Sequence, residues 1–190
     1  MSLLFFLLKP LTCGRIYKVV PSGQQTSAVS IPEDPDKLVA LLEHSNGWVR
    51  DKAQQMLVEG KHRQLAAPLR QMLKSPQNQV GLVHALWTLE GLEMLEATDV
   101  LPLLEHPFWP VRMNALNALS SVITRDNFRV FLPVLESMAR TDTLSAPLIA
   151  FNIPALRKFA PRPADNLLRK IMLQYPENEF VADQPDCRGA

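Results

Sequence analysis

The sequence predicts an all-α protein, a right-handed α-solenoid of about four helical hairpins, each ~31 residues long. An internal repeat is the first observation: residues 41–50 align without gaps with residues 103–112, and both segments begin Leu-Leu-Glu-His and end Val-Arg. Apolar residues at helical spacing are the second. The third is the balance of 16 Pro and 7 Gly, which fits short helices punctuated by Pro and not a Gly-rich phosphate loop.

The repeat length follows from the distance between the two aligned segments. Leu41 and Leu103 lie 62 positions apart (103 − 41), and half of that distance leads to residues 72–81, where a Pro-containing turn is followed by Val. The same step beyond Leu103 leads to Val134, at the end of another apolar stretch. Because a two-helix unit cannot bury both of its apolar stripes alone, the units are expected to stack.

The first hairpin shows the expected signals for helix start, apolar stripe and turn. Asp34 is a candidate N-cap, and Pro35 fits the first helical turn. Asn46-Gly47 predicts a tight turn. The apolar stripes of the two helices consist of Leu38, Leu41 and Leu42, and of Val49, Ala53, Met56 and Leu57. The second helix of the third hairpin repeats the pattern with Val111, Ala115, Ala118, Leu119 and Val122.

The fourth hairpin is predicted over residues 126–160. Its second helix, at residues 144–159, contains Pro147, which fits a first turn, and Pro154, which should kink or split the helix. Residues 162–175 predict a last helix that caps the stack.

Three segments are therefore expected: an N-terminal tail at residues 1–32, the solenoid at 33–175 and a flexible C-terminal tail at 176–190. Residues 14–20 (Gly-Arg-Ile-Tyr-Lys-Val-Val) have the composition of a strand, and a polar linker follows them. The apolar run at residues 3–8 is shorter than a signal-peptide core and has no preceding positive charge, so it makes no convincing signal peptide.

Composition excludes several classes of protein. Cys13 and Cys187 are the only cysteines of the chain, which rules out a disulfide-rich scaffold, a zinc-finger cluster and an iron–sulfur site. No apolar run reaches the ~18 residues of a membrane span. A net charge of +1 does not indicate a strongly basic nucleic-acid binder.

The pairs Val49-Arg50 and Val111-Arg112, each opening a second helix, resemble the Val-Arg signature of HEAT repeats. The resemblance implies that the Val is a core residue and that the Arg joins a ladder between neighbouring units, where it reaches a carboxylate or a carbonyl. The second unit has Gly81 where the Arg is expected, so the ladder should be irregular.

A more specific resemblance rests on residues 44–59 (His-Ser-Asn-Gly-Trp-Val-Arg-Asp-Lys-Ala-Gln-Gln-Met-Leu-Val-Glu) and 84–92 (His-Ala-Leu-Trp-Thr-Leu-Glu-Gly-Leu), preceded by the Gly-Arg-Ile-Tyr stretch at residue 14. Together they resemble bacterial membrane-bound-dehydrogenase-like proteins with a heme-binding domain. Members of that family carry a β-propeller, HEAT repeats and a c-type cytochrome domain, and the resemblance implies an exported or periplasmic location.

The sequence departs from that family where the family's chemistry lies. It has no Cys-x-x-Cys-His motif, and the propeller is absent except for one strand-like segment. We therefore expect no enzyme activity and no cofactor. The prediction is a non-catalytic interaction or scaffold module, the connector of such a protein, whose partner is another protein or domain, such as a propeller or cytochrome domain. The oligomeric state stays open.

Candidate interaction residues are aromatic and basic. Trp48 and Trp109 lie at equivalent turns and fit either packing between units or an aromatic patch for a partner. Arg50 and Arg112 belong to the expected ladder. His44 and His106 recur at equivalent turns, but two repeats of ~10 Å place them roughly 20 Å apart, too far for one metal ion. The two histidines are therefore interpreted as polar turn residues. Glu90 and Glu93 are expected to lie on a solvated face of a helix.

Charge is unevenly distributed along the chain. Residues 34–109 hold 7 basic and 10 acidic side chains, net −3, whereas residues 110–175 hold 9 and 4, net +5. The second half includes Arg157, Lys158 and Arg169. An alternative function is therefore a DNA-binding or DNA-repair solenoid, although a charge of +5 spread over this length is modest and disfavours nucleic acid.

Overall fold

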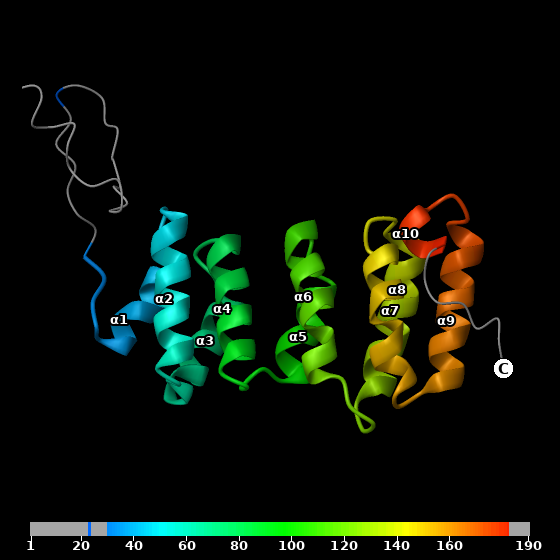
Figure 1. The fold of residues 1–190 in the computed structure, drawn as a ribbon, viewed down its shortest axis with the longest axis horizontal. Coiled ribbons are helices and arrows are strands. Elements are labelled where there is room, and N and C mark those ends of the chain that lie inside the picture. The colour runs from blue at the N-terminus through cyan, green and yellow to red at the C-terminus, as the bar shows by residue number, and fades with distance from the viewer. Residues whose placement is uncertain (1–22, 24–29, 183–190) are drawn as a thin grey trace, which may run out of the picture. The chain divides into compact units, whose positions relative to one another are not determined.

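The computed structural model describes Gly23 and residues 30–182, and Figure 1 shows the arrangement of their helices. Every regular element of this described part is helical, as predicted. The elements are α1 (Pro35–Leu41), α2 (Gly47–Glu59), the 3₁₀-helix η2 (Arg63–Leu65), α3 (Ala66–Lys74), α4 (Gln79–Gly91), α5 (Ala97–Leu104), α6 (Trp109–Val122), α7 (Phe128–Thr141), α8 (Ala146–Arg157), α9 (Pro161–Gln174) and α10 (Glu179–Ala182).

Several predictions fall on residues that the structure does not describe. The apolar run at 3–8, the strand-like segment at 14–20 and both cysteines, Cys13 and Cys187, lie outside the described residues. The C-terminal tail was predicted from residue 176, and within that segment α10 forms a short helix whose Val181 is buried.

Consecutive helices pack in pairs, and the pairs contact one another in chain order. α1 packs against α2, α3 against α4, α5 against α6 and α7 against α8. The second helices of these pairs also contact each other, α2 with α4, α4 with α6 and α6 with α8. Figure 1 shows α2, α4, α6 and α8 following one another in this order. α9 covers α7 and α8, and α10 contacts both α8 and α9.

Local sequence explains where the helices begin. The Asp34 carboxylate accepts a hydrogen bond from the Asp36 N–H, and Pro35 occupies the first helical position, as predicted. The Asn46 side chain caps α2 by accepting from the Trp48 N–H. Asn78 caps α4 in the same role, accepting from the Gly81 N–H. These caps pair amide groups that would otherwise have no helical partner.

The predicted apolar stripes form the core. Three of the four stripe residues of α2 are buried, and Met56 is half-buried. All five of the α6 stripe are buried, two of them small alanines, Ala115 and Ala118, which allow neighbouring helices to approach closely. The core continues from Leu38 in α1 to Ile171 in α9 without interruption.

Two local predictions change in the structure. Of the two outcomes predicted for Pro154, a kink or a split, the split does not occur, because α8 runs from Ala146 to Arg157 through this residue. Pro154 removes one backbone donor, while the nearby Ile153 and Leu156 are buried in the core. Glu93 does not share a helix with Glu90. It follows the end of α4 in the left-handed region, with φ 58°, where its N–H and that of the next residue bond back to helix carbonyls.

Truncation of either predicted core leucine should destabilise the protein strongly. Leu57→Ala and Leu119→Ala each remove a side chain that is fully buried, and such cavities cost about 2–5 kcal/mol of unfolding free energy. Urea unfolding followed by circular dichroism measures the loss. Leu173→Ala, at a residue that is 77% exposed, is the control and should cost under about 0.5 kcal/mol. Equal losses at all three positions would contradict the assignment of the core.

Candidate functional site

The two predicted ladder arginines, Arg50 and Arg112, each bind the turn of their own hairpin and a side chain of the next one. The Arg50 guanidinium donates through one terminal nitrogen to the His44 carbonyl at 2.6 Å and to the Ser45 carbonyl at 3.1 Å. Its Nε donates to His84 Nε2 on α4 at 3.2 Å. The Nδ1 of His84 in turn lies 2.8 Å from Gln54 Oε1 of α2. A half-buried polar link therefore joins α2 to α4.

Arg112 repeats this arrangement in the third hairpin. One terminal nitrogen donates to the His106 carbonyl at 2.9 Å and to the Pro107 carbonyl at 3.0 Å, while Nε and the other terminal nitrogen bind the Asp142 carboxylate. Burial opposes ionisation of Asp142, but hydrogen bonds from Ser145, Arg112 and the Leu144 N–H lower the pKa of its carboxyl overall. Arg50 and Arg112, predicted as interaction residues, are thus engaged within the fold.

The ladder is irregular at position 81, where glycine replaces the expected arginine, and the close approach of Glu43 gives the steric reason. A Cβ at this position would lie 2.3 Å from Cγ of Glu43, whose carboxylate accepts a hydrogen bond from the Gln77 N–H at 2.7 Å. The carboxylate of one hairpin therefore binds the turn of the next. Sequence reasoning missed Arg70, which binds Asp99 at 3.0 Å and the Met94 carbonyl at 2.6 Å.

The recurring histidines act as turn residues, as the sequence favoured. His44 Nδ1 accepts from the Asn46 N–H at 3.0 Å, and His106 Nδ1 accepts from the Phe108 N–H at 3.1 Å. Within residues 30–182, no group of three or more His, Cys, Asp or Glu side chains is placed to hold a metal ion. No helix among these residues has the length and apolar character to cross a membrane.

The structure separates the two predicted tryptophans. Trp48 is 59% exposed at the start of α2 and does not belong to the core. Trp109 is half-buried and lines a hollow of about 350 Å³ beside α6, α8 and α10. All the residues around that hollow are apolar, and we name them the apolar patch: Trp109, Met113, Leu144, Pro147, Leu148, Phe151 and Phe180.

Large exposed side chains gather in the apolar patch. Leu144 is 57% exposed, Phe151 69% and Phe180 75%. Sequence reasoning found Trp109 and missed these three. In α8, Phe151 lies between Ala150 and Asn152, which are both buried, so its side chain falls outside the buried face of this helix.

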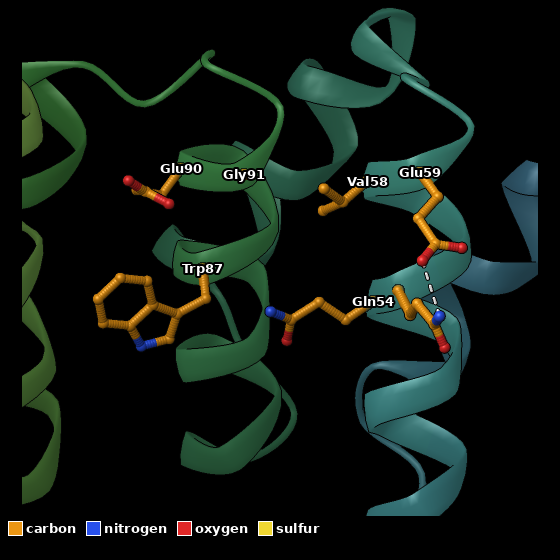
Figure 2. A pocket seen from close by; sticks show the side chains of 7 residues that line it. Gln54, Val58, Glu59, Trp87, Glu90 and Gly91 are labelled. Carbon is orange, nitrogen blue, oxygen red and sulfur yellow. Dashed lines mark hydrogen bonds between the residues drawn. The ribbon is translucent and has the colours of Figure 1, made fainter.

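A second hollow lies along α2 and α4, with a volume of about 390 Å³. Its lining, the α2–α4 groove, consists of Gln54, Gln55, Val58, Glu59, Trp87, Glu90 and Gly91. Figure 2 shows Gln54 and Val58 directed from α2 toward α4, and Trp87 and Glu90 leaving α4 on the side away from α2. Trp87 is half-buried.

The basic residues of the second half do not gather on one helix. Arg157 ends α8 and pairs with Asp165 at 2.7 Å, and Lys158 is the C-cap residue. Arg169 lies on α9 and donates to Asn166 at 3.1 Å. Three of the four carboxylates between residues 110 and 175 accept ion pairs from basic residues of the same segment: Glu136, Asp142 and Asp165.

Comparison with known proteins gives no relative from which a function could be transferred. No protein-family model, no curated protein and no solved structure matches the chain.

His84 should make stability depend on pH. Burial, together with the nearby positive charge of Arg50, lowers the pKa of His84 in the folded protein, whereas Asp51 opposes the shift. The unfolded chain then binds a proton that the folded chain does not, so the free energy of unfolding falls as pH drops below about 6.5. His84→Gln keeps a polar side chain but removes the titrating group, and should flatten this dependence in urea unfolding between pH 5 and 8.

The same measurement contains its own control, because the other histidines are present in both proteins. Only the difference between the two pH profiles reports on His84. If the profiles run parallel from pH 8 to pH 5, His84 does not titrate differently on folding.

Proposed function

We propose that residues 33–175 form a right-handed α-solenoid of HEAT-type hairpins and that the chain is a non-catalytic protein-interaction module. Three features support the architecture: the ~31-residue repeat, the chain-order packing of α2, α4, α6 and α8, and the equivalent bonds of Arg50 and Arg112. Such stacking leaves the exposed sides of the second helices free for binding.

The apolar patch is the observation that carries the proposed function. Its aromatic side chains, Trp109, Phe151 and Phe180, surround a hollow without a charged lining residue. Exposed apolar patches of this kind mark protein–protein contacts, and aromatic residues are enriched at the centres of such contacts. The partner we propose is a polypeptide that inserts apolar side chains into this hollow.

The biological setting rests on the resemblance of residues 44–59 and 84–92 to the membrane-bound-dehydrogenase-like family. On that basis the chain is the connector of an exported bacterial redox protein, and its partner is a propeller or cytochrome domain. The chain itself needs no cofactor in this role.

DNA binding is the competing function, and the structure offers it less support than the apolar patch offers protein binding. Two of the predicted cationic contacts are engaged within the fold, Arg157 with Asp165 and Arg169 with Asn166. DNA binding would appear as an affinity that falls linearly with the logarithm of salt concentration. Protein docking on an apolar patch would depend only weakly on salt.

Replacement of Phe151 should weaken binding of the partner. A photo-crosslinking amino acid at position 151, introduced in the native cell, first identifies the protein that contacts the apolar patch. Phe151→Ser should then lower the affinity of that protein at least about tenfold, because exposed aromatic residues at the centre of an interface often contribute 2 kcal/mol or more. The fold should persist because Phe151 is largely exposed.

Leu173→Ser is the matched control, since Leu173 is also highly exposed but lies on α9 outside the apolar patch. It should leave the affinity unchanged. If both variants bind the partner as tightly as the original chain, or if the only ligand found is DNA with a steep salt dependence, the proposed function is wrong.

A further inference from the structure

The α2–α4 groove contains a tryptophan held in a fixed orientation. The Trp87 Nε1–H donates to Asn114 Oδ1 on α6 at 2.7 Å, and Asn114 Nδ2 donates to the Pro110 carbonyl at 2.8 Å. The polar edge of the indole is therefore bonded to the neighbouring helix, and the half-buried ring lines the groove. A fixed aromatic ring loses little conformational entropy when it binds a ligand.

The groove also has an excess of negative charge. Glu59 and Glu90 line it, and no Lys or Arg does. Glu90 Oε1 accepts from the Ser121 hydroxyl at 2.8 Å, and Glu59 Oε1 accepts from Gln55 Nε2 at 2.7 Å, so the hydrogen bonds to both carboxylates come from neutral groups. Lys52, nearby on α2, donates to Gln55 Oε1 and is not a lining residue.

The positions of these groups suit a long cationic side chain. Trp87 and Glu90 are three residues apart on α4, which places their Cβ atoms about 5–6 Å from each other. Figure 2 shows both side chains leaving the same side of α4. Val58 and Gly91 also line the groove and contribute apolar surface to it. A Cβ at Gly91 would approach Val58 Cγ2 to 2.9 Å, so glycine at this position lets the Val58 side chain of α2 pack directly against α4.

We infer that the α2–α4 groove binds an arginine side chain of a partner polypeptide. The guanidinium stacks on the Trp87 ring and donates to the Glu90 carboxylate, its aliphatic stem lies over Val58 and Gly91, and Glu59 adds to the negative potential. Arginine fits better than lysine because its planar group both stacks on an aromatic ring and donates two parallel hydrogen bonds to a carboxylate. The negative charge of residues 34–109 favours the same ligand.

The indole N–H signals of the three tryptophans report on this binding by nuclear magnetic resonance. The full chain is titrated with the peptide acetyl-Gly-Gly-Arg-Gly-Gly-amide and, separately, with the same peptide carrying citrulline, which has the shape of arginine without its charge. The arginine peptide should give a saturable shift of the Trp87 signal and leave those of Trp48 and Trp109 unmoved. The citrulline peptide should give no saturable shift. A lysine peptide should bind more weakly than the arginine peptide.

Variants identify the carboxylates that contribute. Glu90→Gln should weaken binding about two- to five-fold, as expected for the loss of one exposed ion pair, and Glu59→Gln/Glu90→Gln should weaken it further. Glu177→Gln, beyond α9, makes the same change of net charge away from the groove and should have no effect. The inference fails if the citrulline peptide shifts Trp87 equally, or if Glu90→Gln and Glu177→Gln behave alike.

The inferred binding of arginine in the α2–α4 groove is independent of the proposed docking role of the apolar patch. The groove lies on α2 and α4, whereas the patch lies on α6, α8 and α10. If the arginine peptide does not bind but Phe151→Ser still weakens binding of the partner, only the inference about the groove is wrong. If the arginine peptide binds but Phe151→Ser has no effect, only the proposed role of the apolar patch is wrong.

Discussion

The contact between successive second helices is the interaction on which the rest of the structure depends. Each helix of a helical hairpin has apolar residues on more than one side, and the other helix of the hairpin covers only one of these sides. α6 illustrates this: it packs against α5 within its hairpin and against both α4 and α8 outside it. Val111, Ala115 and Leu119 on α6 are fully buried. No hairpin is therefore expected to be stable alone.

Polar groups supplement this packing and fix its register. Arg50 and Arg112 each bind the turn carbonyls of their own hairpin and a side chain of the next, so a shift of one hairpin against another would leave half-buried donors unpaired. The same bonds engage both guanidinium groups within the fold. The two surfaces proposed for binding, the apolar patch and the α2–α4 groove, are lined by other residues than these arginines.

Much of the fold could be predicted because helical periodicity and caps are local properties of the sequence. The apolar stripes, the Asp34 cap and the ladder arginines all follow from short patterns. The site could be predicted only in part. Trp109 was identified, but its neighbours Phe151 and Phe180 come from helices that meet only in the folded chain. The continuity of α8 through Pro154 depends on burial of the residues around it, which propensity alone does not reveal.

Hydrogen–deuterium exchange of the Leu116→Ala variant tests most directly whether the hairpins share one core. Leu116 is fully buried in α6. Because α6 contacts both α4 and α8, its destabilisation should increase amide exchange in all three helices relative to the original chain. An increase confined to α5 and α6, with unchanged protection in α4 and α8, would show that the hairpins fold independently and would contradict this account.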